Sequence, residues 1–334
     1  MTTIYAAMRN SLLVVTGEEG DWTSARRLDE HDLECVAVSP DEPNRLFVGT
    51  FDAGLQRSTD GGDSFERVGA TVIDTDHVMS AAVSPHEPEE VWVGTEPSAA
   101  YRSKDGGGTF EERPGITDLP SEPEWFFPPR PDTHHVRWIE PDPNEPDRVY
   151  LGIELGAFII TEDAGESWRE RPPGSRRDNH SLATHPAEPG RIYSAAGDGY
   201  AESDDWGESW AHPQDGLEHR YCWSVVPDPG DPDTVLVSSA HGAGSAHRAG
   251  NADTYVYRKR AGEPWECLDD HGLPAGTGVL RAVLAPGGSG GELYAANNRG
   301  IYRTRNAGGS WDRLDVEWPE AFGGQTVRGL AVIA

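Results

Sequence analysis

Histidine, arginine and carboxylate side chains gather in a few short segments of the chain. These segments are PDTHHVRW at 131–138, GIELGA at 152–157, RRDNH at 176–180 and EHRYCW at 218–223. Imidazole and carboxylate together suit Zn²⁺, Mn²⁺ or Fe²⁺. Guanidinium groups clamp carboxylates and phosphates, and paired carboxylates cleave glycosidic bonds. The segments therefore indicate a polar site for one of these three chemistries.

We assign roles to individual residues on this basis. The catalytic candidates are Glu154, Asp178 and His180. The ligand-binding candidates are His135, Arg137, Asp198, Arg220, Tyr221, His241 and Arg299. A divalent metal ion, if the site holds one, would be bound by His77, His135 and His180, although no metal motif of fixed spacing is present. Each group also has a structural alternative: a hydrogen-bonded loop histidine, a salt-bridged arginine, or a Glu154 carboxylate paired with Arg137.

The elements that must position these residues repeat along the chain. An eight-residue segment occurs five times, as STDGGDSF at 58–65, SKDGGGTF at 103–110, TEDAGESW at 161–168, SDDWGESW at 203–210 and TRNAGGSW at 304–311. The side chain of its Asp or Asn accepts hydrogen bonds from backbone N–H groups two or more residues later in the chain. Its Gly tolerates positive φ. The closing aromatic residue anchors the next strand. We call these copies box segments, and each predicts a tight β-hairpin.

A second recurring segment precedes each box segment. It consists of a β-rich run, a Pro/Asp/Gly turn and another β-rich run, as in VAVSPDEPNRLFVGT at 36–50. Four antiparallel strands in repeats of about 40–45 residues are typical of a propeller blade. Six such repeats leave strand-like runs at both ends, at 3–16 and 326–334. We predict an all-β, seven-bladed propeller of four-stranded antiparallel blades, in one domain spanning 1–334, whose seventh blade is closed by the N- and C-terminal strands.

This architecture brings the polar segments together at the mouth of the central channel, on the face opposite the box segments, where ligands bind in many propellers. Aligning the Pro-rich turns gives equivalent positions to Glu34, Met79, Arg137, His180 and Trp223. Because side chains alternate along a strand, the residues two positions earlier lie on the same side. Those residues are Asp32, His77, His135, Asp178 and Tyr221.

Two insertions border this face. Residues 111–132 contain Trp125, Phe126 and Phe127 among prolines, which either stack on a planar ligand or pin the loop to the blades. Residues 241–253 are rich in Gly and Ala and are expected to be a mobile loop or a lid that carries His241, His247 and Arg248.

The composition excludes several classes of partner. The 334 residues carry a net charge of −29, and Lys104 and Lys259 are the only lysines. We expect adaptation to high salt, and neither nucleic-acid binding nor attachment to anionic membranes. The start of the sequence has no signal-peptide pattern and no apolar run spans a bilayer, so we expect a cytoplasmic protein. The three scattered cysteines do not indicate a disulfide framework.

The box segments resemble the Asp-box (BNR) repeat of sialidases and related β-propellers, in which the boxes are structural and lie away from the active site. Together, HHVRW, GIELGA, DNH and RYCW resemble a group of archaeal and bacterial single-domain BNR propellers that are labelled sialidase-like or glycosyl hydrolase. The Arg-Ile-Pro motif of true sialidases does not occur here, so the resemblance implies the fold more than the activity. Photosystem II assembly factors, which are binding scaffolds, are Asp-box propellers of similar size.

These sequence patterns lead to three hypotheses about function. The first is a His/Arg/carboxylate pocket at the channel mouth that binds a small anionic or sugar-like ligand, with or without a divalent metal ion. The second is a sialidase-like glycoside hydrolase that uses two carboxylates, Glu154 with Asp178 or Asp198, at a separation set by its stereochemistry. The third is a scaffold for a protein partner, with no chemistry of its own.

Overall fold

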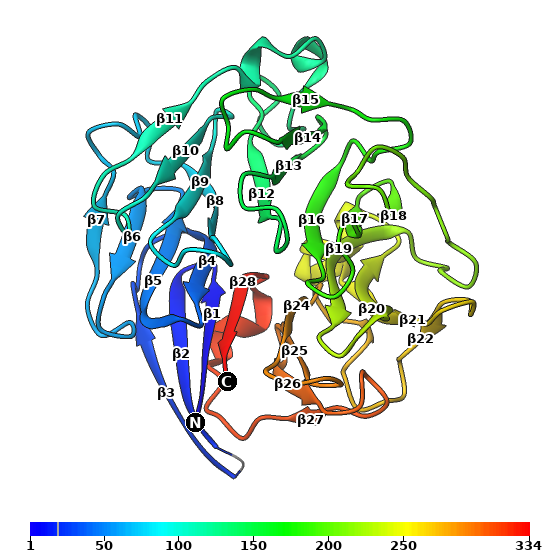
Figure 1. Ribbon diagram of the computed structural model, residues 1–334. Helices are drawn as coiled ribbons and strands as arrows, with labels where there is room; N and C mark the ends of the chain where they lie inside the picture. Colours follow the sequence, from blue (N-terminus) through cyan, green and yellow to red (C-terminus); the bar gives the residue numbers. More distant parts are fainter. Residues whose placement is uncertain (19) are drawn as a thin grey trace.

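The computed structural model describes residues 1–18 and 20–334, which form seven antiparallel β-sheets arranged as blades around a central channel (Figure 1). Neighbouring strands of each blade pair antiparallel and run outward from the channel, and most of them are joined by hairpins. The predicted seven-bladed propeller is therefore confirmed. No helix in this part of the chain is long and apolar enough to cross a membrane.

From the channel outward, the blades contain the following strands. The first four are β28 (Val327–Ile333), β1 (Thr2–Met8), β2 (Ser11–Glu18) and β3 (Asp21–Arg27); β4 (Leu33–Ser39), β5 (Glu42–Thr50), β6 (Leu55–Ser58) and β7 (Glu66–Val68); β8 (Val78–Val83), β9 (Val91–Thr95), β10 (Ala100–Ser103) and β11 (Glu111–Arg113); and β12 (Val136–Pro141), β13 (Val149–Ile153), β14 (Phe158–Thr161) and β15 (Arg169–Glu170).

The last three blades are β16 (Asn179–Thr184), β17 (Ile192–Ala196) and β18 (Gly199–Ser203); β19 (Tyr221–Asp228), β20 (Asp231–Ala240), β21 (Asp253–Lys259) and β22 (Glu266–Cys267), with β23 (Gly276–Thr277) also on β21; and β24 (Val283–Pro286), β25 (Leu293–Asn297), β26 (Gly300–Thr304) and β27 (Asp312–Arg313). The fourth strand of the β16–β18 blade is reduced to a single bridge between Glu202 and Ala211. Four-stranded blades are thus the rule, with this one exception among the described residues.

The two ends of the chain share one blade, as predicted. β28 pairs antiparallel with β1 from Thr3 opposite Ile333 to Met8 opposite Val327, and it lies innermost (Figure 1). This pairing covers the channel side of β1, and β28 itself becomes the innermost strand of the blade.

The innermost strands carry a β-bulge at one recurring place. In β12, for example, Val136 pairs with Ile153 and Trp138 with Gly152, so the register skips Arg137. The same skip occurs in five other innermost strands, at Glu34, Met79, His180, Trp223 and Arg328. A bulge re-aims the side chain of the extra residue. With Arg281, which lies two residues before β24, these residues form a set that we call the hub ring: Glu34, Met79, Arg137, His180, Trp223, Arg281 and Arg328.

Serine side chains join neighbouring blades next to this ring. Ser80 donates a hydrogen bond to the Val136 carbonyl at 2.7 Å. The Val225 amide donates to Ser181 Oγ, and the Leu284 amide donates to Ser224 Oγ, each at 3.0 Å. All three serines directly follow a hub-ring residue and are buried. Buried polar groups of this kind must find partners, and here they fix one blade against the next.

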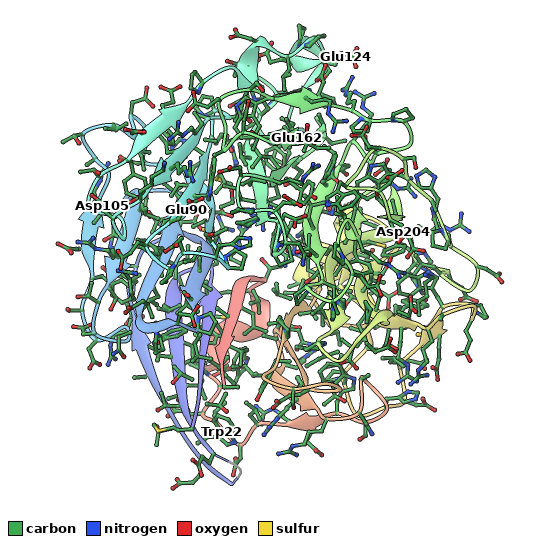
Figure 2. The ribbon with its side chains drawn as sticks, viewed as in Figure 1. Trp22, Glu90, Asp105, Glu124, Glu162 and Asp204 are labelled. Carbon is green, nitrogen blue, oxygen red and sulfur yellow. The ribbon has the colours of Figure 1, made fainter. Side chains whose placement is uncertain are left out.

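The box segments form the turns between third and fourth strands, with one hydrogen-bond pattern. In the copy at 161–168, the Ser167 amide and hydroxyl donate to the two oxygens of Asp163, and the Gly165 amide donates to Thr161 Oγ1. All five copies have positive φ at their fourth and fifth positions. Asp105 of the second copy is labelled at the periphery of the ring in Figure 2. The box segments thus stabilise the outer turns of the blades that contain them, away from the hub ring.

Both insertions contain short ordered elements. Residues 111–132 begin with strand β11 and continue through the 3₁₀ turns η1 (Ile116–Asp118) and η2 (Glu122–Glu124). In this insertion Trp125 is buried in a cluster with Ile116, while Phe126 is exposed. Residues 241–253 contain helix α1 (Ala243–His247) and η3 (Ala249–Asn251), and η4 (Glu320–Gly324) precedes β28. Packing of Trp125 therefore favours the pinning role.

We expect Asp163→Ala to lower the melting temperature more than Asp163→Asn. Hydrogen bonds from Ser167 lower the pKa of Asp163, so the box contributes stability at neutral pH that is lost as the pH falls through the acid range. An asparagine keeps part of this pattern, because Asn306 accepts from the Ser310 amide and donates to its hydroxyl. Scanning calorimetry should separate the two variants by on the order of 2 °C. A melting temperature of Asp163→Ala equal to that of the wild type would contradict a structural role for the carboxylate.

Candidate functional site

Glu154, Asp178 and His180 meet at the channel mouth. His180 belongs to β16, Asp178 directly precedes that strand, and Glu154 follows β13 of the neighbouring blade. His180 Nε2 lies 3.7 Å from Asp178 Oδ1 and 3.8 Å from Glu154 Oε1. One ligand atom from each residue falls within 4.8 Å of the others. The three predicted catalytic residues therefore form one cluster.

The tautomer of His180 is set by its backbone contact. Its Nδ1 lies 2.7 Å from the Cys222 carbonyl oxygen, which only accepts, so Nδ1 carries the proton. Nε2 is the atom that faces the two carboxylates. This atom is buried and has no hydrogen-bond partner among the described residues. A buried ring nitrogen without a hydrogen-bond partner is unusual in a folded protein.

His135 links Glu154 to a further carboxylate. Its Nε2 is 3.1 Å from Glu154 Oε2, and its Nδ1 is 3.3 Å from Glu96 Oε2. Burial alone would lower the pKa of His135, but the two carboxylates raise it on balance. Arg130 in turn binds both oxygens of Glu96, which holds the pKa of that carboxyl at about 2 despite its burial. The result is a row of alternating charges across two blades.

The two carboxylates of the cluster differ in their acidity. Burial would raise the pKa of Glu154, but the hydrogen bond and charge of His135 lower it well below its usual range. Among the described residues, the Leu155 amide is the hydrogen-bond donor to Asp178, at 3.0 Å, and burial raises the pKa of Asp178. Environments that push the pKa values of two neighbouring groups apart are a feature of acid–base sites.

Tyr221 and His247 form the opposite wall. Arg281 Nε donates to His247 Nδ1 at 3.1 Å, and burial lowers the pKa of His247 to about 2, so its proton lies on Nε2. That atom donates to the Tyr221 hydroxyl at 3.0 Å, which leaves the tyrosine proton available to another acceptor. The ring of Tyr221 lies 4.9 Å from that of His180. The insertion at 241–253 thus supplies one partly buried side chain to the site.

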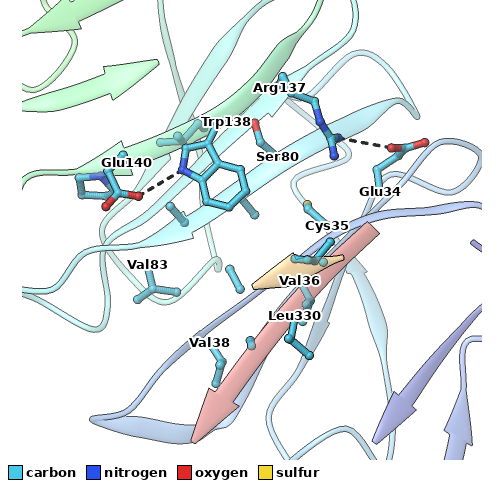
Figure 3. Close-up of a pocket in the computed structure, with 18 of the residues that line it drawn as sticks. Glu34, Cys35, Val36, Val38, Ser80, Val83, Arg137, Trp138, Glu140 and Leu330 are labelled. Carbon is cyan, nitrogen blue, oxygen red and sulfur yellow. Dashed lines mark hydrogen bonds and ion pairs between the residues drawn. The ribbon is translucent and has the colours of Figure 1, made fainter. Parts of the chain in front are cut away.

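The channel below the mouth holds a cavity of about 340 Å³, lined by innermost strands of several blades. Arg137 and Glu34 face each other across its upper end, with 3.6 Å between Arg137 Nη1 and Glu34 Oε2 (Figure 3). Glu140 lines the other end, where it accepts hydrogen bonds from Trp138 and Thr184, and burial raises its pKa to about 7. The walls between are mainly apolar, with Val36, Val83 and Leu330 among them.

Several predicted site residues lie elsewhere. The exposed ones are Asp198, Arg220, His241 and Arg299. Arg220 and Arg299 donate to the carbonyl oxygens of Leu217 and Gly278, and His241 packs against the ring of His219. Asp198 pairs with Arg176 near Asp178. Because their side chains turn toward solvent or the loop backbone, we leave these four out of the buried site.

The predicted three-histidine metal set also changes. His77 stacks on Phe51 with 4.0 Å between ring centroids, and both nitrogens of His135 face carboxylates. Neither belongs to the metal-capable group in the described chain, which consists of His180, Glu154 and Asp178. His135 instead holds Glu154 in place, as residues behind metal ligands commonly do.

Sequence reasoning missed Arg281 and Arg328, and gave no role to Glu96 or Arg130. Arg281 and Arg328 occupy hub-ring positions and were detectable, because both stand two residues before runs that align with Val36. The pairing of Glu96 with Arg130 joins a loop to an insertion 34 residues away. No local pattern in the sequence marks that contact.

No family model matches the chain, and no curated protein matches it. Solved structures do match. An ancestral GH74 enzyme aligns with a TM-score of 0.63 at 15% identity over 90% of this chain and 38% of its own. The GH74 xyloglucanase from Xanthomonas campestris aligns with a TM-score of 0.61 at 15% identity, over 85% of this chain and 45% of its own. YCF48 bound to D1 peptide aligns with a TM-score of 0.58 at 17% identity, over 85% of this chain and 81% of its own.

These likenesses establish the propeller fold alone. The chain spans less than half the length of the GH74 enzymes it matches. Its chemistry therefore has to be argued from its own residues. Those residues offer a buried imidazole nitrogen, two carboxylates of unequal acidity and a tyrosine hydroxyl, a set that can bind a cation or exchange protons with a ligand.

We expect His135 to titrate at a higher pH than an ordinary histidine. Its pKa is raised in the folded state, so its contribution to stability is fully present below about pH 6.5 and is lost as the pH rises through the folded value. Imidazole NMR titration of the wild type checks this, and Glu154→Gln should lower the His135 pKa. A His135 signal that titrates below 6.5 in the wild type would contradict the proposed charge row.

Proposed function

We propose that the channel mouth binds a divalent metal ion through His180, Glu154 and Asp178, and a small anionic or sugar-like molecule beside it. The observation that carries this proposal is the Nε2 atom of His180, which is buried, unpartnered among the described residues and directed at two carboxylates. A cation between the three groups would satisfy all of them. One imidazole and two carboxylates are a donor set that Zn²⁺ and Mn²⁺ accept.

The spacing is compatible with a metal ion. Bonds of 2.0–2.2 Å in a tetrahedral site place ligand atoms roughly 3.3–3.6 Å apart. The separations of 3.7 and 3.8 Å from His180 Nε2 are slightly wider, so a small inward rotation of the carboxylates would complete the site. Each carboxylate is already oriented from behind, Glu154 by His135 and Asp178 by the Leu155 amide. Such outer hydrogen bonds fix metal ligands and raise affinity.

Three protein ligands leave coordination positions open for a ligand. Tyr221 borders this place with a hydroxyl proton that its bond from His247 does not use. A carboxylate, a phosphate or a sugar hydroxyl could accept that proton while bound to the metal ion. A small molecule with oxygen donors is thus the class of ligand that the mouth fits.

The metal site predicts that Zn²⁺ or Mn²⁺ binds at one equivalent per chain. Because this acidic protein attracts cations everywhere on its surface, titration calorimetry should be done at high ionic strength, which screens exposed carboxylates. Glu154→Gln and His180→Gln should each weaken binding at least tenfold. Asp204→Asn, on the outer part of the ring (Figure 2), is the matched control and should bind as the wild type does. Equal loss in all three variants, or none, would discard the site.

A glycoside hydrolase is the second candidate. Glu154 and Asp178 offer oxygens within 4.8 Å of each other, near the separation of about 5–5.5 Å found between the carboxyl groups of retaining enzymes. Their pKa values are displaced in opposite directions. Hydrolysis of aryl glycosides or xyloglucan in the presence of EDTA, abolished by Asp178→Asn, would favour this reading over the metal site.

A protein partner is the third candidate, because YCF48 is a propeller of this fold that binds a peptide. The exposed large hydrophobic side chains in the described chain are Met1, Val72 and Phe126. They come from three different blades or loops. A stable protein interface usually centres on a contiguous apolar patch, so the surface favours this reading less than the channel mouth favours a ligand.

A further inference from the structure

Three guanidinium groups converge inside the channel around one indole and one carboxylate. The Arg281 guanidinium carbon lies 3.6 Å from the centroid of the Trp223 ring, and that of Arg137 lies 5.0 Å from it. Arg137 and Arg328 both approach the same oxygen of Glu34, at 3.6 and 3.3 Å. All five residues belong to the hub ring, so the bulges of different blades assemble this cluster.

The cluster has more positive charge than its partners neutralise. Glu34 is the carboxylate that pairs with it in the described chain, and it serves two arginines at once. Arg281 pairs with none there: its Nη1 donates to the Val327 carbonyl and its Nε to His247. Glu154 lies near Arg137, but it is already hydrogen-bonded to His135. An excess of cations is unexpected in a protein of net charge −29.

Two of these cations are almost out of contact with water, whereas the Arg328 side chain is 21% exposed. Arg281 is 0% exposed and Arg137 is 5% exposed. Burial, together with the charges of Arg328 and Arg137, lowers the pKa of Arg281 well below its ordinary value. A guanidinium nevertheless keeps its proton in proteins. Burying its charge therefore lowers the free energy of unfolding unless an anion compensates it. Buried charges of this kind are retained where a counter-charge binds them.

Each arginine also has an unused donor. Arg281 Nη2, Arg137 Nε and Arg328 Nε are buried and lack hydrogen-bond partners among the described residues. Unpaired Nε atoms occur at several other arginines here, so the Nη2 atom of Arg281 carries most of the weight. A buried donor without an acceptor is costly, and an oxygen-rich anion would supply acceptors for all three groups.

We propose that the hub arginines Arg137, Arg281 and Arg328 form a binding site for a small oxyanion, a carboxylate or a phosphate, inside the central channel. Two of them, with Glu34, line the cavity of about 340 Å³. That volume lies within the range of small-molecule sites, about 300–1,000 Å³. Planar guanidinium groups bind both kinds of oxyanion through paired hydrogen bonds. Trp223 holds two of the arginines in place through cation–π contacts.

This site goes beyond the metal-centred function and does not depend on it. Its residues are distinct from His180, Glu154 and Asp178, although Trp223 lies 4.5 Å from the His180 ring and so connects the two clusters. One small molecule with a carboxylate at the arginines and another oxygen at the metal ion would reach both. The anion site is testable with the metal removed, so failure of one proposal is distinguishable from failure of the other.

Titration calorimetry in EDTA, with inorganic phosphate and with malonate as separate titrants, tests the anion site. At least one oxyanion should bind the wild type at one equivalent per chain, and the affinity should fall at least tenfold in Arg281→Met and in Arg328→Gln. Arg299→Gln is the matched control, because this exposed arginine donates to the Gly278 carbonyl away from the cluster. It should bind as the wild type does.

Thermal unfolding gives an independent readout. Without added anion, Arg281→Met should melt at a higher temperature than the wild type, because it removes a buried unpaired cation but keeps an apolar chain against Trp223. Phosphate or malonate should raise the melting temperature of the wild type and of Arg299→Gln, but not of Arg281→Met. Binding of chloride alone, or an oxyanion affinity that is equal in all four proteins, would overturn the proposal.

Discussion

The bulge in the innermost strands is the constraint on which the rest of the channel depends. A regular antiparallel register alternates its side chains between the two faces of a blade, and none of them would then be forced toward the axis. Skipping one residue at the same place in six blades turns one side chain per blade into the mouth. The serines that follow at Ser80, Ser181 and Ser224 bond to the neighbouring blade, which fixes the rotation of each blade against the next.

The chemistry of the mouth then depends on which residues fill these positions. On one side the hub ring carries His180, and residues of the loops beside it arrange His135, Glu154 and Glu96 as alternating charges. On the other side it carries arginines around Trp223. Because buried electrostatic interactions are strong and unsatisfied groups are costly, each side restricts what can bind there. The buried Nε2 of His180 and the two carboxylates beside it favour a cation, whereas the guanidiniums require acceptors.

Much of the fold could be predicted because it repeats. Five box segments and six repeats mark most of the blades, and the runs at 3–16 and 326–334 pair as their leftover strand patterns implied. The same alignment located Glu34, Arg137, His180 and Trp223 at the channel. It failed for side chains that leave the strand register: Arg220 and Arg299 lie on loops whose direction no repeat specifies, and they point to solvent. Arg281 went unnoticed because its blade has the shorter turn, at 286–291, which obscured the alignment.

The distribution of charge separates this channel from the surface around it. Carboxylates such as Asp105, Glu124 and Asp204 lie on the outer part of the ring (Figure 2), where water and salt screen them. High ionic strength weakens the repulsion between such exposed groups, but it acts far less on charges that water cannot reach. Arg281 therefore keeps its full interaction with a bound anion under conditions that leave surface electrostatics weak. A buried basic cluster inside an acidic protein can thus bind an anion that the exterior repels. Its selectivity comes from desolvated donors at fixed positions and not from long-range attraction.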